Sequence, residues 1–159
     1  RTITGYAQPV VNLGWNNSFN YKNWNLTAFF TGVLGGKIYN SARAHYTSAQ
    51  MFSDGKNVLK EFLDRPNGDA TSSLPSDRYL EDGSYIRLQT LSLGYTFKEF
   101  AGWLRSLQIY ATANNLFTIT SYKGLDPEVN LGGIDPGVDY RWSTYPHTRT
   151  FMLGAKINF

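Results

Sequence analysis

The sequence is 159 residues long, which suffices for one domain with a hydrophobic core and is too short for two. It contains no cysteine, which excludes a disulfide framework and a thiolate metal site. Its net charge of +3 comes without a run of Lys and Arg, so nothing indicates nucleic-acid binding. Aromatic residues make up 16% of the chain, a fraction typical of a β-rich protein that meets an interface. No apolar run approaches the roughly 18 residues that a membrane-spanning helix needs.

Two long strands are predicted near the start of the chain. Apolar and polar residues alternate over about residues 10–21 and 23–34, with a tight turn between them. At a rise of roughly 3.3 Å per residue and a tilt of about 40°, strands of this length cover roughly 25 to 30 Å, the height of the apolar band of an outer-membrane barrel. Strands of soluble domains usually have about half this length. We expect a hairpin whose apolar face is continuous across both strands.

A long loop is predicted over residues 35–82, because Gly35 and Gly36 end the alternation. The spacing of its apolar residues predicts one helix over 41–52 and another over 57–65. A connection of this length with helices of its own is typical of a functional loop on a rigid scaffold.

Strand pairing is expected to resume over residues 84–97 and 107–120, with a short aromatic turn over 98–106 between them. The apolar side chains of the first of these strands change parity. We therefore expect a β-bulge, or the point where the strand leaves the membrane, near Gln89. A second long loop, rich in Gly, Pro and Asp, follows over 122–147.

The last predicted strand, 148–159, alternates as clearly as the first two. Phe151, Leu153 and Ile157 share one parity with Phe159, the final residue of the sequence. An aromatic residue at the end of the last strand is the feature by which the bacterial barrel-assembly machinery recognises its clients. We therefore interpret Phe159 as a barrel assembly signal. The alternative is the edge strand of a soluble sandwich.

These elements together predict an all-β protein, a transmembrane antiparallel β-barrel with long extracellular loops. Short turns and long loops alternate as in bacterial barrels, which puts the loops 35–82 and 122–147 outside and the turns on the periplasmic side. Five strands cannot close a barrel, and open sheet edges are not tolerated in the bilayer. We expect the chain to be the C-terminal portion of a larger barrel. A soluble aromatic-rich β-sandwich that binds glycans is the alternative, and it would have shorter strands around a compact core.

The apolar parity of each strand is expected to face lipid, and the polar parity the lumen. The residues assigned to the lipid-facing surface are Leu13, Leu26, Phe30, Leu93, Ile109, Leu153 and Ile157. Large aromatic residues near the strand ends are expected to form the girdles at the membrane interfaces, although some could pack in a core instead. The girdle residues are Trp15, Tyr21, Trp24, Tyr95 and Trp103.

Three segments carry a resemblance to a known family: DGSYIRLQ (82–89), NNLFT (114–118) and YKGLDPEV (122–129). With the strands around them, over nearly the whole chain, they resemble the C-terminal end of the SusC/RagA family of TonB-dependent outer-membrane transporters. The resemblance implies a barrel of about 22 strands, with an N-terminal plug and a TonB-contacting segment that are not in this sequence. It also implies a SusD-like surface lipoprotein that acts as a lid, energy supplied through the TonB complex, and uptake of oligosaccharides or peptides across the outer membrane of a Gram-negative bacterium.

No residue pattern indicates an enzyme, a metal site or a cofactor. The two histidines, His45 and His147, lie too far apart in the sequence to suggest a pair of metal ligands and are interpreted as loop residues. The alternative of an outer-membrane hydrolase would need a cluster of Ser, His and an acid, which the sequence does not offer. Asp126 and Glu128 flank a proline, which favours a turn over a calcium site.

Residues that contact substrate or the lid protein are expected in the long loops. Sugar rings favour aromatic faces edged by hydrogen-bonding groups. On this ground the candidates are Arg43, His45 and Tyr46 in the first loop and Tyr140, Arg141, Trp142 and Tyr145 in the second. The alternative is that these side chains only pack one loop on the other or against the lid protein.

Overall fold

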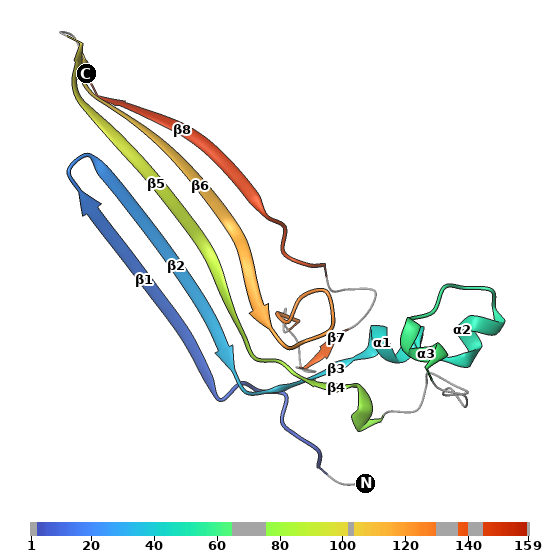
Figure 1. Cartoon of the computed structure of the whole chain (residues 1–159). Helices are drawn as coiled ribbons and strands as arrows, with labels where there is room; N and C mark the ends of the chain where they lie inside the picture. The colour runs from blue at the N-terminus through green and yellow to red at the C-terminus, as the bar shows by residue number, and fades with distance from the viewer. Residues whose placement is uncertain (1–2, 65–75, 102–103, 130–136, 140–144, 159) are drawn as a thin grey trace. The chain divides into compact units, whose positions relative to one another are not determined.

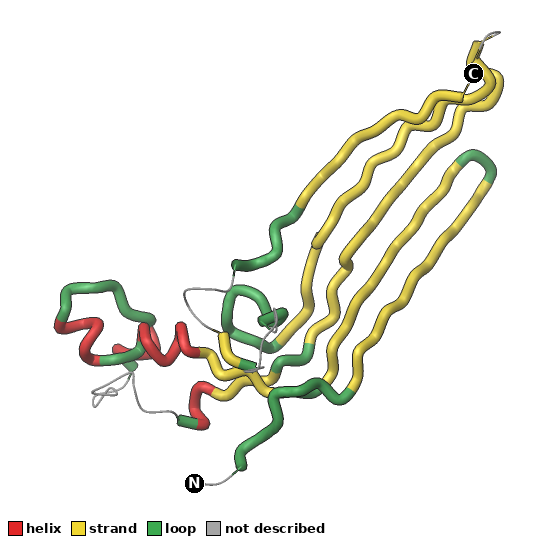
Figure 2. Tube along the Cα trace, turned by 180° about the vertical axis from the view of Figure 1, so that it is seen from behind, coloured by secondary structure: helices red, strands yellow, loops and turns green. Residues whose placement is uncertain are grey.

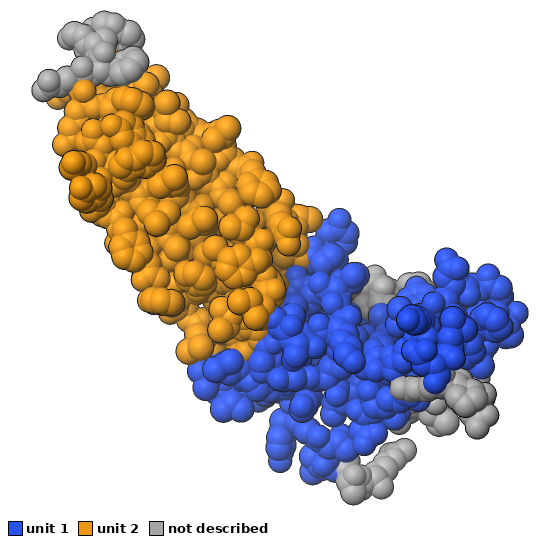
Figure 3. Space-filling model, viewed as in Figure 1, with its two compact units in different colours: residues 1–11, 34–84, 120–146 blue, residues 12–33, 85–119, 147–159 orange. Residues whose placement is uncertain are grey.

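The structure, a computed structural model, describes residues 3–64, 76–101, 104–129, 137–139 and 145–158. The chain divides into two compact units, which Figure 3 colours separately. The strand unit comprises residues 12–33, 85–119 and 147–159, and the loop unit comprises residues 1–11, 34–84 and 120–146. Among the described residues, no helix is both long and apolar enough to cross a membrane.

The described residues form one five-stranded sheet with the order β1-β2-β5-β6-β8 (Figures 1 and 2). Its strands are β1 (Val11–Tyr21), β2 (Trp24–Leu34), β5 (Tyr85–Ala101), β6 (Leu104–Thr120) and β8 (Thr150–Asn158). Strand β2 pairs antiparallel with β5, and β6 pairs antiparallel with β8. Each strand therefore lies beside its neighbours in chain order, as in the wall of an up-and-down barrel.

Strands β5 and β6 are longer than predicted. The aromatic turn expected over 98–106 is wrong, because β5 continues to Ala101 and β6 begins at Leu104. The sequence loses its apolar alternation there, but the backbone hydrogen bonds of a ladder do not depend on side-chain polarity. Pairing therefore extends beyond the part of the two strands that has a continuous apolar face.

The bulge expected in β5 is confirmed. Phe29 pairs with Thr90 and Phe30 with Leu88, which leaves Gln89 without a partner in β2. A single extra residue in one strand shifts its alternation by one position. The apolar side chains on the far side of the bulge are thereby returned to the same face as those before it.

The two faces of the sheet differ in chemistry. On one, which we call the apolar face, the register brings together pairs such as Leu26 and Leu93. On the other, the polar face, hydroxyl and amide groups meet: Ser92 Oγ lies 2.9 Å from Thr112 Oγ1. The segregation follows from the period of two in the sequence, since antiparallel pairing keeps the apolar sets of neighbouring strands on one side.

The residues assigned to the lipid-facing surface lie on the apolar face, and none of them is buried. Leu93 is 43% exposed and Leu153 is 86% exposed, while Leu26 and Phe30 are half-buried. Within the described part of the strand unit, no second layer packs on this face. The compact core that a soluble sandwich would need is therefore absent from it.

The loop unit contains short helices and a small sheet. Its elements are β3 (Lys37–Asn40), α1 (Ser41–Tyr46), α2 (Ala49–Ser53), α3 (Lys60–Leu63), the 3-10 turn η1 (Asp77–Tyr79), β4 (Leu80–Asp82) and β7 (Val138–Asp139). The chain enters the unit through Gly36, whose φ is +84°, and a Cβ at this position would lie 3.0 Å from the backbone oxygen of Ala7. Glycine is favoured here because it has no Cβ to strain this conformation.

The single helix expected over 41–52 is wrong. Thr47 and Ser48 separate α1 from α2, because Ser48 has an extended backbone and its side chain accepts a hydrogen bond from Met51 N. A serine that caps a new helix in this way ends the preceding one. Helix α3, at Lys60–Leu63, is also shorter than the helix expected over 57–65.

Candidate functional site in the loop unit

The two long loops meet in a three-stranded sheet of the loop unit. β3 pairs antiparallel with β4, which closes the first loop, and parallel with β7, which belongs to the second. Tyr39 N donates to Gly137 O at 2.6 Å, and Ser41 Oγ donates to Asp139 O. Segments that lie almost a hundred residues apart in the sequence are therefore held side by side.

Asn40 joins β3 to α1 and is 2% exposed. Its Oδ1 accepts a hydrogen bond from Arg43 N at 2.8 Å, and its Nδ2 donates to Glu81 Oε1 at 3.4 Å. An asparagine at this position satisfies one of the amides that a helix start leaves without a partner. The cap fixes where α1 begins and thereby the position of Arg43.

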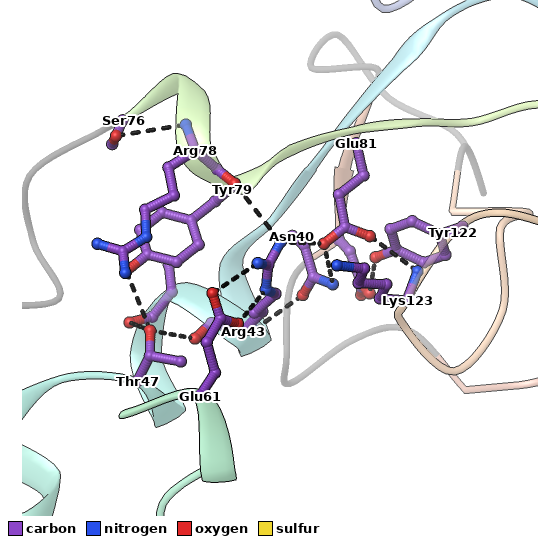
Figure 4. A network of polar contacts seen from close by, with 12 residues as sticks. Asn40, Arg43, Thr47, Glu61, Ser76, Arg78, Tyr79, Glu81, Tyr122 and Lys123 are labelled. Atoms are coloured by element: carbon purple, nitrogen blue, oxygen red, sulfur yellow. Dashed lines mark hydrogen bonds and ion pairs between the residues drawn. The ribbon is translucent and has the colours of Figure 1, made fainter. Parts of the chain in front are cut away.

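Arg43 lies between two carboxylates, as Figure 4 shows. Its Nε and Nη2 donate to the two oxygens of Glu61, both at 2.7 Å, and its Nη1 donates to Glu81 Oε1 at 2.8 Å. The hydrogen bond to Glu61, joined by that to Glu81 and opposed by burial, raises the pKa of Arg43 above its ordinary value. The forked pairing is the strong form of an arginine–carboxylate contact, and it joins α1 to α3 and β4.

The second loop is tied to the same cluster by Tyr122 and Lys123. The Tyr122 hydroxyl donates to Asp139 Oδ2 at 2.5 Å, and Lys123 N donates to Glu81 Oε2 at 2.8 Å (Figure 4). Burial, together with the hydrogen bond to Asp139, raises the pKa of Tyr122 above its ordinary value of 10.0. The two oxygens of Glu81 therefore accept hydrogen bonds from both loops.

A pocket of about 630 Å³ opens beside this cluster. Its described charged lining residues are Arg43, Lys60, Glu61, Lys123 and Asp139, and its described apolar lining residues are Ala42, Tyr46, Leu59 and Leu125. Arg43 and Glu61 neutralise each other, and the side chains of Lys60 and Lys123 form no ion pair with a described residue. The pocket thus offers two lysine cations and the carboxylate of Asp139 beside an apolar wall.

Two of the residues expected to contact substrate or a lid protein, Arg43 and Tyr46, line this pocket. His45 is half-buried and packs edge-on against Tyr46 with ring centroids 5.2 Å apart, and Tyr145 is 76% exposed outside the pocket lining. The guanidinium of Arg43 already holds two carboxylates, so its first role is to join elements of the loop unit. The candidates that lie outside the described residues are Tyr140, Arg141 and Trp142.

The charged residues of this cluster and its pocket that sequence reasoning missed include Lys60, Glu61, Glu81 and Lys123. Glu81 directly precedes the segment DGSYIRLQ, and Lys123 lies inside YKGLDPEV, so the segments that carry the family resemblance could have pointed to both. No pattern in the sequence pointed to Glu61 or Lys60, because charged residues of a short exposed helix are expected to face solvent.

The aromatic residues expected at the membrane interfaces lie in two places in the strand unit. Tyr21 and Trp24 flank the β1–β2 turn, and the Trp24 ring packs edge-on against Tyr95 with centroids 4.8 Å apart. Trp15 lies inside β1 instead and stacks on Phe30 at 5.6 Å. The expected girdle residue Trp103 and the expected assembly signal Phe159 lie outside the described residues.

Comparison with known proteins identifies relatives over the full chain, although no protein-family model matches it. The chain is 33% identical to TonB-dependent receptor P3 of Formosa agariphila, an alignment that covers 100% of the chain and 17% of the receptor. It is 29% identical to TonB-dependent receptor SusC of Bacteroides thetaiotaomicron, over 97% of the chain and 16% of that receptor. The chain belongs to the SusC/RagA family of TonB-dependent receptors.

The fold agrees with this family assignment. A chain in the structure of the RagAB peptide importer in the 'closed-closed' state aligns with a TM-score of 0.76 at 23% identity, over 99% of this SusC/RagA chain and 18% of the importer chain. The predicted fold class, part of a transmembrane β-barrel, is thereby confirmed. The chain spans about a sixth of the length of the relatives it matches. As part of a SusC/RagA receptor it belongs to the outer membrane of a Gram-negative bacterium, and the relatives it matches are receptors and a peptide importer.

Proposed function

We propose that the chain forms part of the wall and the extracellular mouth of a TonB-dependent importer that takes up oligosaccharides or peptides. The observation that carries the proposal is the sheet with one apolar face in a chain that aligns throughout with TonB-dependent receptors. In this arrangement the apolar face meets lipid, the polar face meets the lumen and the plug, and the loops 35–82 and 122–147 face outward. The remaining barrel, the plug and the TonB-contacting segment belong to the rest of the receptor.

The import proposal is tested in cells that express the whole receptor. Uptake of labelled oligosaccharides and labelled peptides is measured before and after a protonophore collapses the proton-motive force. One of the two substrate classes should accumulate, and its accumulation should stop when the protonophore is added. Uptake of either class that continues unchanged after the protonophore contradicts the proposal, as does the absence of uptake of both.

The pocket of the loop unit is the proposed contact point for the cargo. Tyr46→Ala and Lys123→Ala remove an aromatic face and a cation from its lining. Lys56→Ala is the matched control, because Lys56 is an exposed residue of the same unit outside the lining. Both pocket variants should weaken uptake at an unchanged amount of receptor in the membrane, and the control should not. Equal uptake by all three variants would exclude the pocket as a cargo contact.

The composition of the pocket favours peptides over neutral oligosaccharides as cargo. A sugar site is expected to offer aromatic faces edged by neutral hydrogen-bonding groups, whereas Tyr46 supplies the one aromatic ring among the described lining residues. Lys60 and Lys123 together with Leu59 match the carboxylate and the apolar side chains of a peptide instead. Competition for uptake between a labelled peptide and a neutral oligosaccharide distinguishes the two.

A SusD-like lipoprotein is the proposed partner of the loop unit. Several large apolar side chains of this unit are exposed to solvent, an arrangement that typically marks an interaction surface. Those of the two long loops include Phe52, Leu59, Leu63 and Leu125. Phe52→Glu with Leu63→Glu should abolish co-purification of the lipoprotein with the receptor, while Gln50→Glu, an exposed position on α2, should not. Undiminished co-purification of the double variant would contradict this interface.

A further inference from the structure

We propose that the apolar face of the strand unit holds an anionic phospholipid, with one acyl chain in a groove across β2, β5, β6 and β8 and the headgroup at the end that carries the β1–β2 turn. The site is distinct from import, but its assignment to the inner leaflet rests on the orientation proposed above. A smooth barrel wall would contact lipid without selecting it. Selection needs a shaped groove and a charged end, and the strand unit has both.

The groove has a volume of about 610 Å³ and arises from unequal side chains on neighbouring strands. Ala111 on β6 pairs with Leu153 on β8. Ser92 on β5 contacts Thr112 on β6, so in this antiparallel register Leu93 lies opposite Ala111. Ala111 therefore has Leu93 on one neighbouring strand and Leu153 on the other. Because strands lie about 4.8 Å apart, the two leucines stand on strands roughly 10 Å apart, which leaves room for one hydrocarbon chain over the alanine methyl group.

Aromatic rings close the groove at the end that carries the β1–β2 turn. Trp24 packs edge-on against Tyr95 at 4.8 Å, and Tyr95 packs edge-on against Phe97 at 4.7 Å. Rings of this kind are enriched where the hydrocarbon of a bilayer meets the headgroups. The acyl chain therefore lies toward Ala111, and the polar part of the lipid lies beyond the rings.

The charges of the strand unit select an anionic headgroup. Its sequence contains one acidic residue, Glu99, and six basic ones. Lys22, Lys98 and Arg105 belong to the β1–β2 turn and to the β5 and β6 ends nearest it, and Glu99 lies on the same end of β5. This end therefore carries three positive charges and one negative charge, and Lys22 Nζ lies 5.4 Å from the ring centre of Tyr21. Arg105 shares the parity of Ala111 on β6, so it continues the line of the groove.

The same charges decide between a lipid and a second copy of the receptor as the occupant. Two copies related by symmetry across this groove would bring their basic clusters together, and like charges at an interface oppose association. An anionic phospholipid matches both the single-chain width of the groove and the sign of the charge. Each basic residue near the headgroup should raise the affinity for an anionic lipid by about fivefold.

The test uses the whole receptor, purified in detergent and stripped of lipid. It is offered phosphatidylglycerol and phosphatidylcholine with the same acyl chains, and retained lipid is counted by native mass spectrometry. The wild type should retain one phosphatidylglycerol in preference to phosphatidylcholine. Ala111→Phe fills the groove and should abolish retention, while Ala28→Phe, the same change on the apolar face outside the groove, should not.

A second pair of variants tests the charged end and remains informative if Ala111→Phe does not fold. Lys22→Gln with Arg105→Gln should lower retention of phosphatidylglycerol by about 25-fold and leave phosphatidylcholine unchanged. Lys156→Gln, on the polar face opposite Gln108, is the control and should change neither. The proposal is overturned if the wild type shows no preference for phosphatidylglycerol over phosphatidylcholine, or if Ala111→Phe and Ala28→Phe retain lipid equally. It is also overturned if the wild type is a dimer without retained lipid and Ala111→Phe dissociates that dimer.

Discussion

Replacing Arg43 with methionine should open the loop unit while the strand unit stays folded. The change removes the guanidinium that joins α1, α3 and β4 but keeps a long apolar stem. The change should be most costly at Glu81, because its carboxylate is on a side chain that is only 9% exposed and loses its only ion-pair partner among the described residues. Glu61 is 28% exposed and regains water more easily.

The magnitude follows from these exposures. Removal of one partner from a buried ion pair costs about 3 to 5 kcal/mol. The lower end applies here, because Glu81 keeps its hydrogen bonds from Asn40 and from Lys123 N. The free energy needed to open the loop unit should therefore fall by about 3 kcal/mol. This corresponds to roughly a 150-fold increase in the open population.

Hydrogen exchange of backbone amides in the whole receptor measures this population. The amides of residues 37–63 should exchange roughly 150-fold faster in Arg43→Met, with no change in β1 or β2. Lys60→Gln, on the same helix as Glu61, is the control and should leave exchange within about twofold of the wild type. Adding Glu81→Gln to Arg43→Met should restore much of the protection against exchange. The neutral amide side chain carries no charge that needs a cation, and its oxygen can still accept the hydrogen bond from Lys123 N.

Two results would refute this reasoning. If Arg43→Met exchanges as slowly as Lys60→Gln, the ion pairs do not hold the loop unit together. If Glu81→Gln fails to restore protection, the cost does not come from a carboxylate left without its cation.

Three further outcomes are expected. Because the pKa of Tyr122 is raised in the folded state, the loop unit should keep its full stability below pH 10 and lose it as the pH rises further. Tyr122→Phe should reduce this dependence in an alkaline titration followed by near-UV circular dichroism, and the remainder should come from Tyr39, whose pKa is also raised by burial. An unchanged titration would contradict the role of burial and Asp139. Deletion of Gln89 should remove the bulge and leave Leu88 opposite Phe30 on the apolar face. The yield of folded receptor in the membrane should therefore stay near that of the wild type, and a large loss of yield would show that the bulge itself is required. Leu26→Arg should destabilise the barrel by about 2 to 4 kcal/mol in a denaturant titration, whereas Thr27→Arg on the polar face should cost about 1 kcal/mol or less. Equal costs for the two variants would argue against a lipid-facing apolar side.

The strand unit could be predicted almost entirely from the sequence. Alternation with a period of two fixes which side chains share a face, and a change of parity within one strand has only a few physical causes, of which a bulge at Gln89 is one. The error at 98–106 arose because apolar alternation reports contact with lipid, whereas strand pairing depends on the backbone. The family resemblance came from segments that lie in β5, in β6 and directly after β6.

The loop unit could be predicted only in outline. The sequence indicated its extent, its short helices and two residues that line its pocket, Arg43 and Tyr46. It could not indicate that Arg43 pairs with Glu61 and Glu81, because ion pairs between residues 18 and 38 positions apart leave no periodic trace.

By itself the sequence determined the chemistry of the sheet, since the two faces of a strand are set by which residues stand next to each other in the chain. Tertiary structure alone decided which charges neutralise each other in the loop unit and which remain available to a ligand. It also decided that Ala111 would lie between two leucines on neighbouring strands, because strand register sets that neighbourhood and no local pattern encodes it.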